Sequence, residues 1–159
     1  MSATDEAIRA GDRLPRIASV RPEGGLAVAV TWASGLRAGR TDIVDLAPVV
    51  MTLRFYSPLR HDAALFASVT IVEDGSALSW DNGRIDMAAS TVERLAREAM
   101  SGDDFRAFLS RNHLTLDAAA AILGISRRQT AYFAKGKPVP RVVALACAGY
   151  EAGRRVIAA

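Results

Sequence analysis

The stretch LTLDAAAAILGISRRQTAYFAKGKPVP, residues 114–140, determines how the C-terminal third of this 159-residue chain folds. Its pattern predicts two helices joined at Gly124, because a glycine tolerates the left-handed backbone conformation that ends a helix. Thr115 is placed to cap the first helix, and Ser126 is placed to cap the second. We expect the second helix to run from Arg127 to Ala134.

The second of these helices has two chemically different faces. Thr130 and Phe133 lie three residues apart, so we expect both to point into a core together with Ile125. The other side chains of the helix face outward or flank the core face. They are Arg127, Arg128, Gln129, Ala131 and Tyr132.

The outward face carries residue types that read DNA. Arginine suits a two-point contact with guanine, and glutamine suits one with adenine. Two helices around a tight turn, with cations exposed on the second, form the pattern of a helix-turn-helix whose second helix enters the major groove. The predicted base contacts are Arg127, Arg128, Gln129 and Tyr132.

Positive charge continues directly after the second helix. Lys135 and Lys137 are the two lysines of the whole chain, and Gly136 stands between them. Cationic side chains and backbone N–H groups bind phosphate, which positions a protein on DNA without reading sequence. The predicted phosphate contacts are Thr115, Ser126, Lys135, Gly136, Lys137 and Arg141. The alternative is a helical hairpin that serves packing alone and has a solvated cationic face.

The stretch resembles the Xre/Cro-like helix-turn-helix family over residues 103–151. The resemblance implies a compact bundle of four or five helices, including one at 105–111 and one from Val142 onward. It also implies that the four predicted base contacts occupy base-facing positions. The chain departs from the family pattern at Leu116, Thr130 and Ala134. The matching residues are Leu114, Thr115, Ala120, Leu123, Gly124, Ile125, Ser126, Phe133, Gly136, Lys137 and Pro140.

The charge distribution separates the two parts of the chain. Residues 1–102 carry 11 basic and 13 acidic side chains, whereas residues 103–159 carry 9 basic and 4 acidic ones. The whole chain has a net charge of +3. The basic charge is therefore concentrated where nucleic acid is predicted to bind, and the N-terminal part is not an obvious nucleic-acid surface.

The N-terminal part predicts short β-strands. Apolar residues alternate from Leu26 to Trp32, and further strands are expected at 41–46, 68–72 and 78–80. The segments 21–25, 74–75 and 81–83 read as turns, and 61–66 as one helical turn. These elements predict a small, mainly antiparallel sheet of about four to six strands.

Residues 14–91 resemble a bacterial family known as domain-of-unknown-function family 2442. The resemblance implies an antitoxin-like role, because members are often encoded beside small proteins suspected to be toxins, but it supplies no established activity. The matching pieces are Pro15-Arg16-Ile17, Leu26 to Trp32, Asp45-Leu46-Ala47-Pro48, Pro58-Leu59-Arg60, Leu65-Phe66, Ser79 to Gly83 and Ile85-Asp86.

The predicted fold class is α+β, with three segments. Residues 1–13 form a flexible N-terminus, residues 14–100 an α+β domain, and residues 103–159 an all-α helix-turn-helix domain. An amphipathic helix over 91–100 closes the first domain, and Ser101 is expected to cap the helix that opens the second.

Few residues suggest an enzyme. His61 and Asp62, with Asp42, Asp45 and Asp86, could be assembled into an acid–base site, but their spacing favours turns and caps. His61 and His113 lack metal-ligand spacing, and one cysteine, Cys147, excludes a multi-cysteine zinc site and an internal disulfide. We therefore expect no catalytic residue, metal or cofactor. Trp32 and Trp80 are interpreted as core residues; an exposed Trp80 would instead indicate a partner contact.

The sequence therefore predicts a cytoplasmic, sequence-specific DNA-binding transcriptional regulator that is not an enzyme. It carries no pattern typical of a signal peptide or a membrane span. We expect double-stranded DNA as its ligand, a homodimer as its assembly and, in an antitoxin-like autorepressor, a small toxin-like protein as partner of the N-terminal domain. The alternatives are a toxin-neutralising interaction module that does not read DNA and a ligand-responsive regulator.

Overall fold

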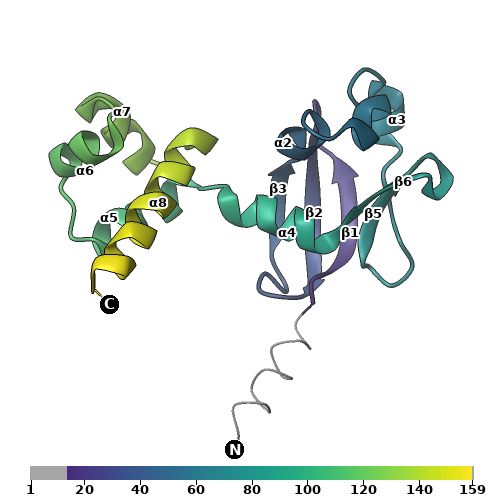
Figure 1. Ribbon diagram of the computed structural model, residues 1–159, viewed down its shortest axis with the longest axis horizontal. Coiled ribbons are helices and arrows are strands. Elements are labelled where there is room, and N and C mark those ends of the chain that lie inside the picture. The colour runs from purple at the N-terminus through teal and green to yellow at the C-terminus, as the bar shows by residue number, and fades with distance from the viewer. Residues whose placement is uncertain (1–13, 159) are drawn as a thin grey trace, which may run out of the picture. The chain divides into compact units, whose positions relative to one another are not determined.

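The computed structural model describes residues 14–158, and the chain divides into two compact units with the boundary between Ala96 and Arg97 (Figure 1). Antiparallel sheets form the first unit and helices form the second, so the predicted α+β class is confirmed. The predicted flexible segment, residues 1–13, lies outside the described residues. No helix among the described residues is long and apolar enough to cross a membrane.

The first unit begins with a three-stranded antiparallel sheet. Strand β2 (Ala27–Ser34) lies between β1 (Arg16–Pro22) and β3 (Thr41–Asp45). In its register Val28 pairs with Pro22 on one side and with Val44 on the other. Strand β1 was not expected from the sequence, because its end was interpreted as part of the turn at 21–25.

A second antiparallel sheet follows, in the order β4 (Thr70–Ile71), β5 (Ala77–Trp80) and β6 (Ile85–Ala88). The prediction of a single sheet was therefore wrong: the six strands within residues 14–158 form two sheets of three. The sheets meet where the backbone N–H of Ile17 donates to the carbonyl oxygen of Gly75 at 2.8 Å. The pairing of β1 is irregular at Ile17, which ends the regular ladder there.

Helical segments lie between and after the strands of the first unit. They are α2 (Ala47–Val50), the 3₁₀ segment η1 (Arg54–Leu59), α3 (Ala63–Ala67), the 3₁₀ turn η2 (Asp81–Gly83) and, after β6, α4 (Ala89–Glu98). Two carboxylates considered for catalysis stabilise these segments instead. Asp45 accepts a hydrogen bond from the N–H of Ala47 at 2.9 Å, and Asp62 caps α3 by accepting from Leu65 at 2.8 Å.

Both tryptophans belong to the core of the first unit. Trp32 and Trp80 are each 1% exposed, and both indole N–H groups have a partner. Trp32 donates to Asp42 at 2.8 Å, and Trp80 donates to the carbonyl oxygen of Phe66 at 3.0 Å. The alternative of an exposed Trp80 that contacts a partner is therefore excluded, and Asp42 is committed to a structural hydrogen bond.

The second unit, over the residues that the structure describes, is a bundle of four helices. They are α5 (Gly102–Arg111), α6 (Leu116–Leu123), α7 (Arg127–Ala134) and α8 (Arg141–Ala158). Ser101 caps α5 with a reciprocal capping box, as the sequence predicts. The core of this unit contains Phe105, Phe108, Phe133, Val143 and Cys147.

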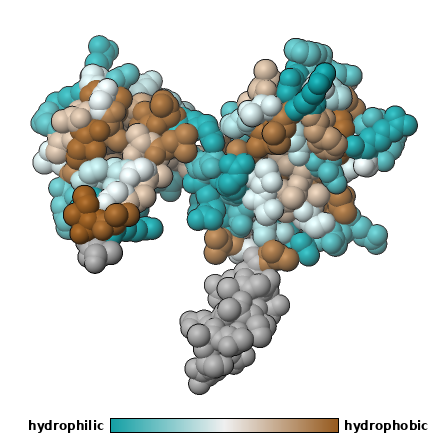
Figure 2. Space-filling view, viewed as in Figure 1, coloured by the Kyte–Doolittle hydropathy of each residue, from teal (hydrophilic) through white to brown (hydrophobic). Residues whose placement is uncertain are grey.

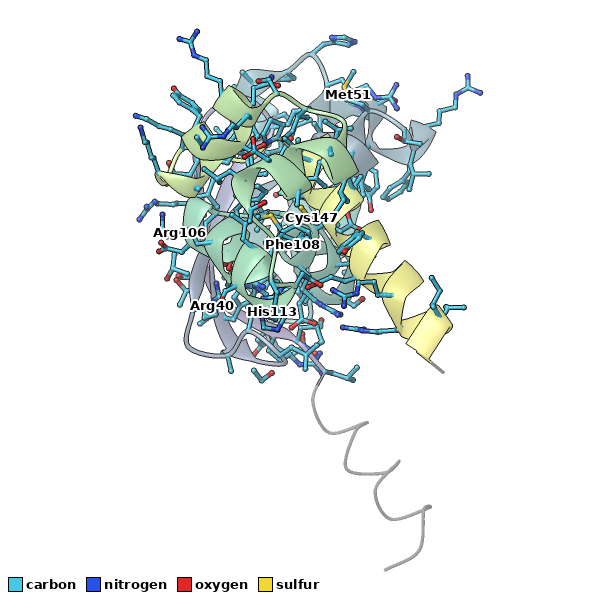
Figure 3. All side chains as sticks on the ribbon, turned by 90° about the vertical axis from the view of Figure 1, so that its left-hand side faces the viewer. Arg40, Met51, Arg106, Phe108, His113 and Cys147 are labelled. Atoms are coloured by element: carbon cyan, nitrogen blue, oxygen red, sulfur yellow. The ribbon has the colours of Figure 1, made fainter. Side chains whose placement is uncertain are left out.

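The aromatic rings hold the bundle together. The ring centroids of Phe105 and Phe133 are 5.8 Å apart, and the two rings lie edge to face. Aromatic pairs favour this arrangement. Cys147 lies beside Phe108 in the interior (Figure 3), and burial raises the pKa of its thiol to about 11. The cysteine is thus a buried apolar side chain, as expected.

Candidate nucleic-acid interface

The turn between α6 and α7 has the predicted geometry. Thr115 caps α6 by accepting a hydrogen bond from the N–H of Ala118 at 3.1 Å. Gly124 ends α6 in the left-handed conformation, at φ 67° and ψ 30°. The N–H of Ile125 then returns to the carbonyl oxygen of Ala120 at 3.1 Å. Because these bonds satisfy the helix end, the direction in which α7 leaves the turn is fixed.

A capping box begins α7 and uses one of the predicted base contacts. The hydroxyl of Ser126 accepts from the N–H of Gln129 at 3.1 Å, and the side-chain oxygen of Gln129 accepts from the N–H of Ser126 at 3.1 Å. A two-point contact with adenine requires both the amide oxygen and the amide nitrogen of a glutamine. In this conformation the side-chain oxygen of Gln129 is used by the capping box, and only its amide nitrogen is left for a ligand.

The core-facing side of α7 matches the sequence analysis. Thr130 and Phe133 are buried, while Ile125 is half-buried against the same core. Thr130 can replace an aliphatic residue there because its hydroxyl donates to the carbonyl oxygen of Ser126 at 3.0 Å. No polar side-chain atom is left unsatisfied by this burial.

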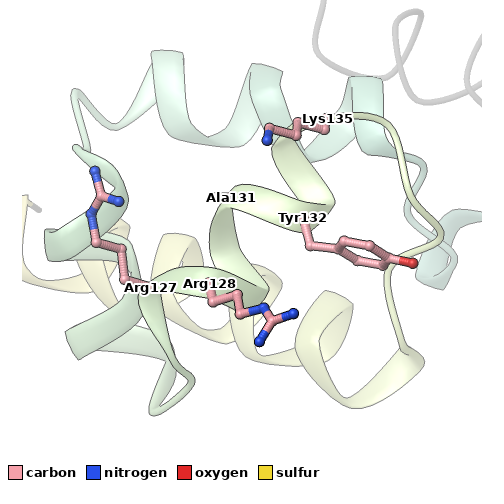
Figure 4. A pocket seen from close by; sticks show the side chains of 5 residues that line it. All are labelled: Arg127, Arg128, Ala131, Tyr132 and Lys135. Carbon is pink, nitrogen blue, oxygen red and sulfur yellow. The ribbon is translucent and has the colours of Figure 1, made fainter.

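The opposite side of α7 is a shallow concave surface (Figure 4). The structure brings together on it three of the predicted base contacts and one predicted phosphate contact. Gln129 is not part of its lining, which consists of Arg127, Arg128, Ala131, Tyr132 and Lys135. The small side chain of Ala131 leaves room between the two arginines and the tyrosine. We call these five residues the α7 face.

The two arginines of the α7 face differ in their environment. Arg128 is exposed and forms no hydrogen bond or ion pair with any residue that the structure describes. Arg127 forms an ion pair in which its Nε lies 2.9 Å from Oδ1 of Asp117, although both side chains are well exposed, at 64% and 74%. This ion pair between α6 and α7 was not expected from the sequence. The spacing along the chain gives no signal for it, since the two residues lie on different helices.

Tyr132 lies at the end of the α7 face nearest the following loop. Its side chain is 55% exposed, and the ammonium group of Lys137 lies 5.7 Å from the centroid of its ring. This cation–π contact holds a positive charge over the ring of Tyr132. Lys135 is exposed and has no ion-pair partner among residues 14–158.

The other predicted phosphate contacts are already engaged within the fold. The N–H of Gly136 donates to the carbonyl oxygen of Phe133 at 3.0 Å, so this N–H is not free to bind phosphate. Arg141 forms an ion pair with Glu98. Gly136 and Arg141 therefore have structural partners that the sequence analysis did not foresee, whereas Thr115 and Ser126 are exposed caps.

Gly136 has a second structural role, which positions α7. It adopts φ 99°, and its backbone lies so close to Gly102 that a Cβ added to Gly102 would overlap the Cα of Gly136. Arg106 of α5 also donates to the carbonyl oxygen of Ala134 at 2.6 Å. The C-terminal end of α7 is therefore held against the start of α5.

The described residues contain no group of three or more metal-ligating side chains. The chain is thus an α+β protein whose helical unit presents a cationic helix face on a capped turn. No protein-family model matches the chain, and no curated protein matches it.

A solved structure does match. The chain is 30% identical to a protein from Nitrosomonas europaea ATCC 19718 that is described as a "Putative DNA Binding Protein". The match covers 89% of this chain and 90% of that chain, with a TM-score of 0.46. On this identity and coverage, the chain belongs to the same family as the Nitrosomonas europaea protein.

Proposed function

We propose that this protein binds double-stranded DNA by placing α7 in the major groove. The observation that carries the proposal is the α7 face, where Arg127, Arg128 and Lys135 surround an accessible tyrosine. The major groove is wide enough to admit a helix, and its base edges offer acceptors to arginine. The description of the Nitrosomonas europaea relative as a DNA-binding protein supports the same proposal.

The residues divide into two roles. Arg128, which has no partner among the described residues, and Arg127 are the principal base readers, with Tyr132 beside them. Lys135 and Lys137 bind phosphate by charge, because they follow the helix directly and remain exposed. Gln129 contributes to base reading only through its amide nitrogen unless the capping box opens.

We further propose that binding is sequence-specific and serves transcriptional regulation as an Xre-like helix-turn-helix protein. One such helix reads about a half-site, so a two-fold homodimer on a palindromic operator is the expected assembly. In this proposal the first unit binds a small toxin-like protein, which makes the protein an antitoxin-like autorepressor of the bacterial cytoplasm. It acts without a catalytic residue or a cofactor.

A specific observation favours a second candidate, a protein-interaction module that does not read DNA. Three large apolar side chains are more than half exposed in the segment around η1: Met51, Leu53 and Phe55. In the second unit, Val156 and Ile157 expose apolar surface at the C-terminal end of α8 (Figure 2). Exposed apolar groups of this kind mark protein contacts when they are contiguous.

A DNA titration separates the two candidates. A fluorescent duplex from the protein's own promoter should bind, and the affinity should fall steeply as the salt concentration rises, because phosphate contacts release counterions. Absence of binding even at low salt would contradict the DNA proposal and favour the interaction module. Light scattering with and without the duplex tests the homodimer, which a strict monomer in both conditions would contradict.

Substitutions separate base reading from phosphate binding. Arg128→Ala should reduce the preference for the best site by about 1–3 kcal/mol, and Gln129→Ala should reduce it by less, because only the amide nitrogen of Gln129 is left for a base. Lys135→Ala or Lys137→Ala should weaken binding to every sequence alike and flatten the salt dependence. An equal, uniform loss for all four variants would show that the base-reading assignment is wrong.

A further inference from the structure

The ion pair between Asp117 and Arg127 places a negative charge beside a surface proposed to bind a polyanion. Asp117 stands in the first turn of α6, and its carboxylate contacts the arginine at the edge of the α7 face. Between Arg111 and Arg141 it is the single acidic residue among six cations. A carboxylate there repels any phosphate group that lies within the screening length, which is about 10 Å at ordinary ionic strength. Because this carboxylate opposes phosphate binding, its role has to be sought in its effect on Arg127.

The geometry of the ion pair indicates how Asp117 affects Arg127. Asp117 engages Nε of Arg127 at 2.9 Å, which is one edge of the planar guanidinium group. Arginine carries five N–H donors in a fixed fork, so the four N–H donors of the two Nη atoms are left available. An arginine held by Nε has fewer rotamers open to it, and it loses less side-chain entropy when it binds.

We propose that Asp117 is a positioning residue that holds Arg127 for base readout and discriminates against binding to arbitrary DNA. The proposal rests on the DNA-binding function proposed above. The carboxylate fixes the direction in which the Nη donors point, which favours the site whose acceptors match them. At the same time its charge weakens the attraction to phosphate, which every sequence offers equally. The first effect increases the ratio of specific to non-specific affinity, whereas the second lowers the affinity for every sequence and leaves the ratio unchanged.

The test compares Asp117→Asn with a matched control, Asp103→Asn. Both aspartates lie in the first turn of a helix, both pair with an exposed arginine, and each substitution removes one negative charge from the second unit. Asp117→Asn should strengthen binding to a scrambled duplex. It should also lower the ratio of promoter to scrambled affinity by about two- to fivefold, which is the range expected for one exposed ion pair. Asp103→Asn should leave the ratio unchanged.

Two further measurements distinguish positioning from stability. In an Arg127→Ala background, Asp117→Asn should no longer change the promoter-to-scrambled ratio, because the residue through which it acts is gone. In the free protein, the Nε–Hε resonance of Arg127 in an NMR spectrum should move on Asp117→Asn but not on Asp103→Asn. An equal ratio for both variants, with the wild type still preferring its promoter, would overturn this proposal alone. A wild type that binds no DNA would overturn the proposed function, and this inference with it.

Discussion

Gly102→Ala should destabilise the helical unit, because the start of α5 lies too close to the end of α7 and the residue after it for a side chain to fit between them. A Cβ on Gly102 would overlap the Cα of Gly136, and it would lie 2.8 Å from the carbonyl carbon of Gly136 and 2.9 Å from the carbonyl oxygen of Phe133. These neighbours are backbone atoms and cannot rotate away. The two helix ends must therefore separate, and overpacking of this kind costs about 1–3 kcal/mol.

Gly149→Ala is a matched control with the opposite expected sign. Gly149 lies in α8, and nothing lies within 4 Å of the Cβ that alanine would add there. Replacing an unconstrained glycine inside a helix by alanine stabilises the helix by about 0.5–1 kcal/mol. The two variants make the same chemical change, so their difference measures the steric contact and not the propensity of alanine.

Hydrogen exchange measured by mass spectrometry can follow each unit separately. Peptides from α5 and α7 should exchange faster in Gly102→Ala and no faster in Gly149→Ala, because local opening reports the stability of the unit that contains them. Peptides from β2 provide an internal reference and should be unchanged in both variants. Exchange in Gly102→Ala equal to that of the wild type would refute the close approach of the two glycines.

Three other predictions concern a cap, a carboxylate and a thiol. Ser126→Ala should destabilise the second unit by about 1 kcal/mol in urea unfolding, because it removes the N-cap of α7; an unchanged midpoint would contradict the capping box. Arg37 hydrogen-bonds to Asp42 and lowers the pKa of that carboxyl. The resulting stability is present above the unfolded pKa of about 3.9 and is lost as the pH falls through the folded pKa, so Asp42→Asn should flatten the acid side of a stability–pH curve. Cys147, whose pKa is raised to about 11 by burial, should react with an aromatic disulfide at pH 8 only as fast as the unit opens, and immediate reaction would contradict its burial.

The helical unit followed from local signals in the sequence. Caps and helix stops depend on residues within about four positions of each other, so Thr115, Gly124 and Ser126 determined the bounds of α6 and α7. The burial of Thr130 and Phe133 followed from their spacing. These features require no knowledge of the rest of the chain.

The features that the sequence did not reveal depend on contacts between distant residues. The division into two sheets depends on Ile17 meeting Gly75, and the pairing of Arg127 with Asp117 depends on how two helices cross. Strand β1 was missed because a proline at its end suggested a turn. Gln129 was assigned to DNA because its residue type suits adenine, whereas its position three residues after Ser126 also suits a capping box.

The central claim is that the α7 face contacts DNA, and charge reversal tests it most directly. Arg128→Glu and Arg84→Glu change the net charge equally, but Arg84 lies in the first unit, where its side chain is 81% exposed. Fluorescence anisotropy with the promoter duplex, at one fixed salt concentration, should show that Arg128→Glu weakens binding by roughly tenfold or more, because a base contact and its charge are both lost. Arg84→Glu should bind like the wild type. Equal affinities for the two variants would contradict the account.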